Sequence, residues 1–231
     1  IKKESHQEER QQARREMDEA ARKSLQSQPV KIKIYQGDCL DLSQNLHNNS
    51  IDDIITDPAY GYEYLDCWSK LSLIASQKLK PGGFCIAYTG KMYLNDVMRR
   101  MDEHMEYFWT INLLHKGPFN KTYARFVEER YKPILIYIKP PLEETLLSKR
   151  REHFIDVLQG TGREKTDHDW QQSEDELKYL FEKFTQEGNT ILDPFAGSGT
   201  TLAMAQKLNR HAIGYELDGK YIPIIKQRLG L

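Results

Sequence analysis

The stretch ILDPFAGSGTT, residues 191 to 201, joins a short apolar run to a glycine-rich turn and then to helix-forming residues. A strand, a glycine turn and a helix in this order are typical of the edge where an open α/β sheet binds its ligand. Gly197 and Gly199 let a ligand approach the backbone closely. The start of the following helix offers unpaired N–H groups to an anionic group. The stretch therefore predicts an α/β domain with a ligand at this turn.

Three classes of ligand use such turns, and the sequence argues against two of them. No lysine follows Gly199, where a P-loop has one, and Leu202 stands where a dinucleotide fingerprint has its third glycine. The third class is S-adenosylmethionine, with its carboxylate at the helix start and its ribose held by an acid after the next strand. Glu216 stands in that place. The alternative is a tight turn that binds nothing, and Asp193, Phe195 and Glu216 together disfavour it.

The rest of the chain alternates predicted strands with predicted helices. Residues 1–28 are polar helix formers, expected to be a linker helix or the end of a preceding domain. Loops are predicted at 37–41 (GDCLD) and over the polar stretch 139–170. Strands are predicted at 30–35, 51–56, 84–88, 107–114, 133–138, 190–192 and 211–215, and helices at 63–79, 91–104, 173–186, 199–209 and 218–229. This alternation predicts one domain over residues 29–231, with a mostly parallel sheet covered on both faces.

Composition narrows the class of protein. The 231 residues carry a net charge of −1, and no apolar run approaches the roughly 20 residues of a membrane helix. No signal peptide is visible, so a cytoplasmic protein without a membrane partner is expected. Cys39, Cys67 and Cys85 show no metal-binding spacing, and we expect reduced thiols near the core and no metal.

A second motif, DPAY at residues 57–60, follows the predicted strand 51–56. A lone Asp-Pro is usually a turn. Beside a methyl donor, the Asp57 carboxylate and the Pro58 carbonyl could accept both N–H bonds of a base's amino group, which favours a pyramidal, nucleophilic nitrogen. Tyr60 offers a flat face on which a flipped-out base can stack. We therefore predict Asp57, Pro58 and Tyr60 as the catalytic residues.

DPAY followed by LDPFAGSGTT resembles the amino-methyltransferases that modify adenine N6 or cytosine N4 in DNA, with the motif order of their β group. The resemblance implies a Rossmann-like seven-stranded sheet with one antiparallel strand, in which 107–114 and 133–138 form the terminal hairpin. It implies S-adenosyl-L-methionine as cofactor, S-adenosyl-L-homocysteine as product and DNA as partner. Adenine N6 is favoured over cytosine N4 as the target. Ala59 replaces the family's usual second proline and removes no chemical group.

The resemblance also assigns cofactor residues. GDCLD places Asp38 and Cys39 near the adenine, and HDWQQSEDE places Trp170, Gln172 and Ser173 near the methionine. The remaining predicted cofactor residues lie in the two motifs or after the strand 211–215: Asp57, Asp193, Phe195, Ala196, Gly197, Ser198, Gly199, Thr200 and Glu216. The pattern looks closest to methylases of phages and mobile elements, some of which carry a preceding ParB-like domain. A homodimer is also compatible with it.

DNA contact is predicted in a basic segment, residues 115–132, with five Lys or Arg against two Glu. The predicted DNA-binding residues are His115, Lys116, Lys121, Tyr123, Arg125 and Arg130, and a second target-recognition element is expected at about 140–170. A solvated charged loop is the alternative for this segment. For the whole chain the alternatives are a catalytically silent DNA-binding relative and a methyltransferase of small molecules or proteins.

Overall fold

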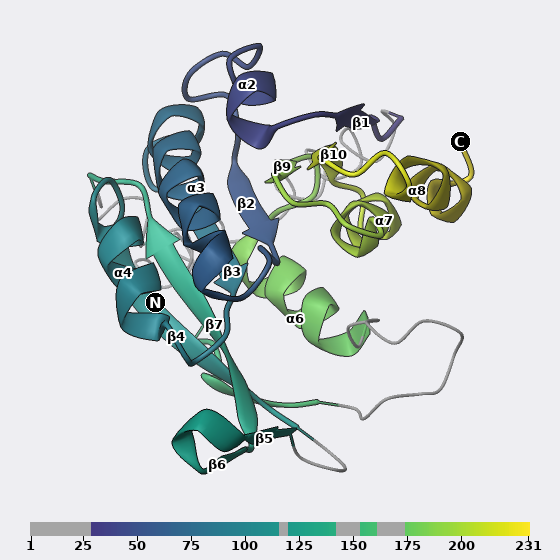
Figure 1. Cartoon of the computed structure of the whole chain (residues 1–231). Coiled ribbons are helices and arrows are strands. Elements are labelled where there is room, and N and C mark those ends of the chain that lie inside the picture. The colour runs from purple at the N-terminus through teal and green to yellow at the C-terminus, as the bar shows by residue number, and fades with distance from the viewer. Residues whose placement is uncertain (1–28, 116–119, 142–152, 161–173) are drawn as a thin grey trace, which may run out of the picture.

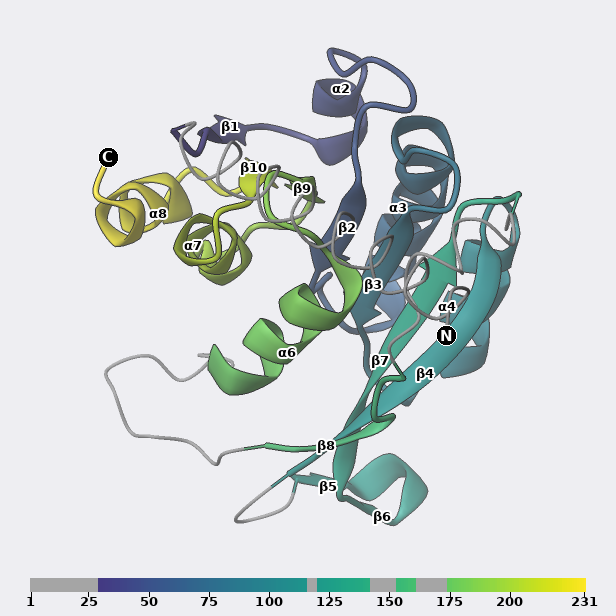
Figure 2. The ribbon, with the colours of Figure 1, turned by 180° about the vertical axis from the view of Figure 1, so that it is seen from behind.

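A computed structural model describes residues 29–115, 120–141, 153–160 and 174–231. Its largest sheet has the strand order β1-β10-β9-β2-β3-β7-β4-β8 (Figures 1 and 2). The strands are β1 Ile32–Gln36, β2 Asp53–Thr56, β3 Phe84–Tyr88, β4 Glu106–Leu114, β7 Tyr131–Ile138, β8 Val157–Gln159, β9 Thr190–Asp193 and β10 His211–Glu216. Only β7 runs against its neighbours in this sheet, pairing antiparallel with β3 and with β4. The Rossmann-like, mostly parallel sheet is therefore confirmed.

Two layers of helices cover the sheet. On one face lie α2 Cys39–Ser43, α3 Leu65–Lys78 and α4 Leu94–Asp102, and on the other α6 Glu174–Phe184, α7 Thr200–Lys207 and α8 Tyr221–Leu229 (Figure 1). Successive strand residues point to opposite layers, as strand geometry requires. Ile86 of β3 packs in the α6 layer, and its neighbour Cys85 packs in the α3 layer.

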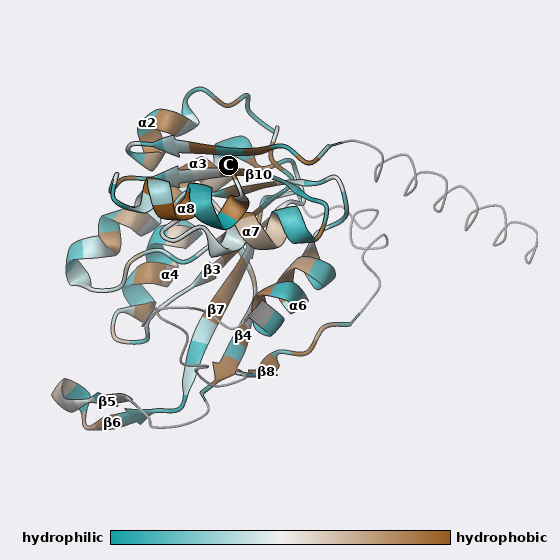
Figure 3. Ribbon diagram, turned by 90° about the vertical axis from the view of Figure 1, so that its right-hand side faces the viewer, coloured by the Kyte–Doolittle hydropathy of each residue, from teal (hydrophilic) through white to brown (hydrophobic). Residues whose placement is uncertain are grey.

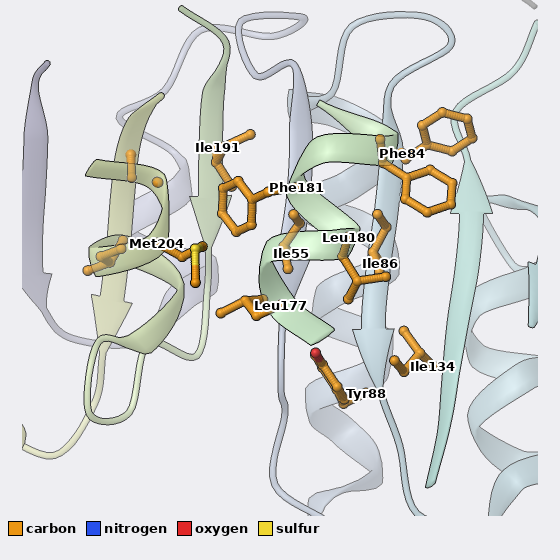
Figure 4. Close-up of a cluster of buried hydrophobic side chains, with 14 of the residues drawn as sticks. Ile55, Phe84, Ile86, Tyr88, Ile134, Leu177, Leu180, Phe181, Ile191 and Met204 are labelled. Atoms are coloured by element: carbon orange, nitrogen blue, oxygen red, sulfur yellow. The ribbon is translucent and has the colours of Figure 1, made fainter. Parts of the chain in front are cut away.

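The larger core cluster lies between the sheet and α6. Leu177, Leu180 and Phe181 of α6 recur at helical spacing and are buried against Ile55 and Ile86 of the sheet (Figure 4). All five residues of β3 are buried, which is typical of a central strand covered on both faces. Figure 3 shows hydrophobic strands between helices whose outer sides are hydrophilic. This packing fixes the carboxyl ends of β2, β3, β9 and β10, where the candidate site lies.

Three sequence predictions about local structure are wrong. The predicted loop 37–41 contains the start of α2, because the Asp38 side chain caps this helix by accepting a hydrogen bond from the Leu40 N–H. The predicted irregular stretch 139–170 contains β8, which pairs parallel with β4 at the sheet edge. This strand raises the count in the sheet from the predicted seven to eight.

A small hairpin lies between β4 and β7 in the sequence and extends beyond the ends of these two strands. It consists of β5 Asn120–Thr122, the 3₁₀ turn η2 Tyr123–Arg125 and β6 Val127–Glu129. A further 3₁₀ turn, η1 Tyr62–Tyr64, leads into α3. The predicted pairing of 107–114 with 133–138 is confirmed by the antiparallel β4–β7 pair, but this hairpin is not terminal, because β8 pairs with β4 at the edge of the sheet. None of the helices described is long and apolar enough to cross a membrane. The predicted helix in 1–28 lies outside the described residues.

Candidate functional site

The two motifs found in the sequence meet at the middle of the sheet. β2 and β9 are parallel neighbours, so DPAY and the glycine turn leave the sheet side by side. The Thr56 hydroxyl donates a hydrogen bond of 2.7 Å to Asp193 Oδ1 and joins the two strand ends. From β2 the chain continues to β3 on one side, and from β9 to β10 on the other. This reversal of strand order is the usual position of a ligand crevice in open α/β sheets.

The glycine turn needs both of its glycines, for different reasons. Gly197 has φ +52°, and a Cβ placed there would meet nothing within 4 Å, so open space adjoins its backbone. Gly199 has φ +81°, and a Cβ there would come within 2.9 Å of Ile225 in α8. Gly199 therefore allows α7 to pack closely on α8, whereas Gly197 leaves room where a ligand can approach the backbone.

Glu216 ties three chain segments together at the end of β10. Its Oε2 accepts a hydrogen bond from the Gly197 N–H at 2.7 Å, and its Oε1 accepts one from the Asp218 N–H at 2.8 Å. Its backbone carbonyl accepts a bond from the Gly37 N–H at the end of β1. Each carboxylate oxygen has capacity for a further hydrogen bond. The carboxylate and the open space at Gly197 therefore fit a ligand that carries ribose hydroxyls.

Asp38 and Cys39 lie at the end of β1, beside this carboxylate. The Lys70 ammonium lies 2.8 Å from Asp38 Oδ2, and this contact holds the pKa of the Asp38 carboxyl below its usual value. Burial raises the pKa of the Cys39 thiol to about 12, so the thiol stays protonated and packs as a small apolar group. Among the described residues, no cluster of His, Cys, Asp or Glu could hold a metal ion.

Several predicted cofactor residues are buried or hydrogen-bonded within the glycine turn and its flanking helices. Asp193 is buried, which raises its pKa to about 6, and its Oδ1 also accepts a bond from the Phe195 N–H. The hydroxyls of Ser198 and Thr200 lie 3.2 and 2.6 Å from Nη1 of Arg228 in α8. Ala196 is buried, and Phe195 packs against the core on the α3 side. Trp170, Gln172 and Ser173 lie outside the described residues.

The Asp57 carboxylate has a cation beside it. Lys132 Nζ lies 3.0 Å from Asp57 Oδ2 and 3.3 Å from Oδ1. The Tyr60 hydroxyl donates a hydrogen bond to the same carboxylate. The Tyr60 side chain is 40% exposed, and its Cβ lies against Gly90. Pro58 is buried and fixes the turn. Asp57, Pro58 and Tyr60 are thus brought together with an acceptor and a ring accessible from one side.

Sequence reasoning missed three residues around Asp57. Lys132 is the second residue of β7, and its ammonium group lies over the rings of Tyr60 and Tyr88 at 4.9 and 4.7 Å. Glu176, in the first turn of α6, is only 7% exposed, and burial raises its pKa to about 7. The Tyr88 hydroxyl is buried without a hydrogen-bond partner among the described residues. A lysine before Pro133 and a glutamate in an acidic helix start carry no sequence signal that would single them out.

The predicted DNA-binding residues that the structure describes lie on or beside the β5–β6 hairpin. Lys121 and Arg125 are exposed and form no ion pair within the described part of the chain, and Arg130 pairs with Glu128 at 2.6 Å. The His115 N–H donates to the Arg130 carbonyl where the hairpin leaves the sheet. Tyr123 begins the turn η2, and Lys116 lies outside the described residues. Phe126 follows η2 with φ +52° and is 96% exposed.

The hairpin is anchored near the Asp57 site. Lys91 Nζ donates to the Tyr131 carbonyl at 2.6 Å and lies 3.3 Å from Glu129 Oε2. Lys91 belongs to the loop after β3, close to Gly90 and hence to Tyr60. The Thr122 hydroxyl also donates to the Glu129 carboxylate. The exposed cations of the hairpin therefore lie at the same end of the sheet as the catalytic motif.

Comparisons with known proteins find a matching family model, related sequences and structures of the same fold. Residues 45–227 match a family model described as DNA methylase. The type II methyltransferase M.HpaI of Haemophilus parainfluenzae is 24% identical over 222 residues, which cover 80% of this chain and 70% of that protein. The structure of the PvuII DNA methyltransferase, described as cytosine-N4-specific, superposes with a TM-score of 0.72 at 18% identity, covering 87% of this chain and 86% of the other. M1.HpyAVI, solved as a complex with SAM, superposes with a TM-score of 0.65 at 23% identity, covering 87% of this chain and 100% of the other.

Proposed function

The chain belongs to the DNA methylase family that its residues 45–227 match, and we propose that it transfers a methyl group from S-adenosyl-L-methionine to an exocyclic amino group of DNA, at adenine N6. The observation that carries the proposal is the contact between the two motifs. Thr56 and Asp193 join the end of β2 to the end of β9, so Asp57 and the glycine turn leave the sheet from adjacent strand ends. A donor at the turn and a base at Asp57 would be neighbours.

The cofactor end of the site is built around Glu216 and Gly197. Glu216 would hold the ribose hydroxyls with its remaining acceptor capacity, and the backbone at Gly197 would leave room for the chain that links ribose and methionine. The N-terminus of α7 favours the methionine carboxylate. When bound, S-adenosyl-L-methionine supplies an electrophilic methyl group on a positively charged sulfur.

The catalytic end of the site prepares the amino group of the target base. Asp57 and the Pro58 carbonyl accept its two N–H bonds, so the nitrogen lone pair turns away from the ring and toward the methyl group. The nitrogen lone pair would form the new N–C bond with the methyl group of a bound donor, whose sulfur would keep the electron pair of the C–S bond. The nitrogen then releases one proton, which Asp57 can accept. Tyr60, held by its bond to Asp57, stacks on the base.

Adenine N6 is favoured over cytosine N4 on two grounds. An acid at position 57 is used for both bases in the family, whereas serine there leans toward cytosine. Adenine also has the larger face for Tyr60 and leaves a weaker base pair when it is extruded. The PvuII enzyme, described as specific for cytosine N4, shares the fold at 18% identity and leaves the base open for this chain.

Nucleoside analysis tests this proposal. The protein is incubated with duplex DNA and a methyl-labelled donor, and the digested nucleosides are separated by mass spectrometry. We expect label in N6-methyladenine. Label in N4-methylcytosine alone would overturn the base assignment and keep the reaction class, and label in neither base would overturn both.

A further inference from the structure

Lys132 occupies the place that the target base needs. Its ammonium group lies 3.0 and 3.3 Å from the two Asp57 oxygens, so it uses the acceptor that the proposed reaction reserves for the base's N–H. The same group lies over the Tyr60 ring, 4.9 Å from its centre, where a base would stack. A base that enters must therefore displace this cation from both positions.

Methyl transfer also requires the cation to leave. Positive charge develops on the amino nitrogen as it attacks, and the donor brings a positive sulfur to the same space. An ammonium group that stayed beside Asp57 would repel both charges and would compete for the carboxylate. Only interactions that favour the transition state accelerate the reaction. The cation needs a second acceptor nearby when the base is bound.

Glu176 is that acceptor. Glu176 is buried in the first turn of α6. The next residue, Leu177, packs on the sheet face that also receives the Tyr88 side chain (Figure 4). Lys132 and Asp57 both act on Glu176 electrostatically, with opposite signs. It forms no hydrogen bond or ion pair with another described residue. Lys132 already lies over the Tyr88 ring at 4.7 Å, and the field of Glu176 reaches the Tyr88 hydroxyl. Lys132 therefore contacts Asp57 and the Tyr88 ring at the same time, and Glu176 acts electrostatically on both Lys132 and Tyr88.

We propose that Lys132 is a placeholder for the target amino group, which holds the Asp57 carboxylate while the site is empty and turns to Glu176 when the base enters. The proposal rests on the proposed function, because it needs Asp57 to accept the base. Lys132 is then a positioning residue, and Glu176 decides how readily it leaves. The titratable groups facing the pair come from the loop after β2, from β3, β7 and β9, and from α6: Asp57, Tyr60, Tyr88, Lys132, Asp193, Asp175 and Glu176.

The pH profile of kcat/KM for DNA tests the proposal. A protonated Glu176 cannot receive Lys132, so kcat/KM of the wild type should fall as the pH drops below about 7 and level off about tenfold lower, where the neutral Glu176 behaves as Gln does. Glu176→Gln should lose this fall at low pH, the acid limb of the profile. Its KM for DNA at pH 8 should be about tenfold higher, because Lys132 stays on Asp57 and fewer molecules can bind the base. Lys132→Met should also lose the limb, with a KM about threefold lower. The double variant should behave as Lys132→Met does.

Two variants serve as matched controls. Lys139→Met changes a lysine just beyond the other end of β7, whose Nζ bonds Asn49 and the Leu79 carbonyl. Asp175→Asn changes the exposed carboxylate next to Glu176. Both should keep the acid limb of the wild type. If Lys132→Met does not fold, Glu176→Gln and Lys132→Arg decide: Arg should keep the limb and raise KM, because it holds Asp57 through two bonds.

Three outcomes overturn the placeholder. The first is an acid limb near pH 7 that persists in both Lys132→Met and Glu176→Gln. The second is a rate that Lys132→Met loses at every pH and Lys132→Arg restores, which would place the cation in the chemical step. The third is a KM that neither variant changes beyond the controls. A wild type that labels no amino group in DNA would instead contradict the proposed function.

Discussion

The Glu216 carboxylate accepts a hydrogen bond from the Gly197 N–H at 2.7 Å, across 19 positions of sequence. The acid after β10 and the turn after β9 are therefore one unit, because the position of the acid fixes the backbone of the turn. Its other oxygen binds the Asp218 N–H, so the carboxylate is held from two sides before any ligand arrives. Such preorganisation reduces the entropy lost on binding.

Replacing this acid should weaken cofactor binding. Glu216→Ala removes a charged acceptor and two bonds to backbone, and a hydrogen bond to a charged group contributes about 1.5–3 kcal/mol. We expect the Kd for S-adenosyl-L-methionine to rise about 10- to 100-fold in calorimetry. Asp218→Asn is the control, since its carboxylate lies two residues further on and pairs with Lys220. A folded Glu216→Ala variant with unchanged affinity would show that the ribose acid is assigned wrongly.

The β5–β6 hairpin should contribute to DNA affinity through its charge. Replacing Lys121, Arg125 and Arg130 by Ala should lower the slope of log affinity against log salt by about 0.9 for each DNA phosphate that these side chains neutralise. A control triple of exposed cations on other elements, Lys80, Arg99 and Lys178, should leave the slope unchanged. Equal slopes for the two triple variants in a fluorescence anisotropy titration would mean that the hairpin is a solvated charged segment that does not contact DNA.

Glu176 should make stability depend on pH. Burial raises its pKa from 4.5 to about 7 in the folded state, so between these values the folded protein holds a proton that the unfolded chain has lost. Its contribution is complete below about pH 4.5 and is lost as the pH rises through 7. Glu176→Gln should be more stable than the wild type at pH 8 by on the order of 1–3 kcal/mol, with the gain shrinking toward pH 5. Urea denaturation at both pH values measures this, and a gain that grows toward low pH would contradict it.

The bond between the two strand ends should stabilise the fold. Thr56→Val keeps the shape of a buried strand residue and removes the donor to Asp193 Oδ1. Asp193 Oδ1 keeps the bond from the Phe195 N–H, so the loss should be that of one hydrogen bond, about 0.5–1.5 kcal/mol. Thr110→Val is the control, because the Thr110 hydroxyl bonds the exposed Tyr107 hydroxyl. Denaturant midpoints that are equal for the two variants would mean that this bond does not hold the motifs together.

The sequence was sufficient for the elements that have a strong pattern. β2 and β3 contain apolar runs because both faces of these strands are buried. The apolar residues of α3 recur at helical spacing because one stripe of this helix is buried. The glycine turn predicted a strand-to-helix connection, because Gly199 adopts a left-handed conformation that few other residues tolerate. The DPAY motif and this turn were predicted to face one ligand, and the β2–β9 pairing brings them together.

The remaining features depend on contacts between distant residues. β8 has only three residues, and it is a strand because it pairs with β4 at the edge of the sheet. Its own sequence is too short to show a strand pattern. Lys132 lies 75 positions from Asp57, and only the antiparallel course of β7 places its amino group at the carboxylate. The burial of Glu176 likewise follows from how α6 packs on the sheet. Such residues carry ordinary surface composition in the sequence and acquire their role through packing.

In the proposed reaction Asp57 activates an amino group of DNA for methylation, and the decisive measurement is the transfer of label by Asp57→Ala. The variant and the wild type are compared for label from S-adenosyl-L-methionine in N6-methyladenine, with Asp66→Ala as a control that removes an exposed acid at the start of α3. We expect Asp57→Ala to lose at least about 100-fold in kcat, since removing one preorganised group at a developing charge costs roughly that much. The Kd for the cofactor should stay near that of the wild type. A variant that still labels adenine within a few-fold of the wild type would contradict the account.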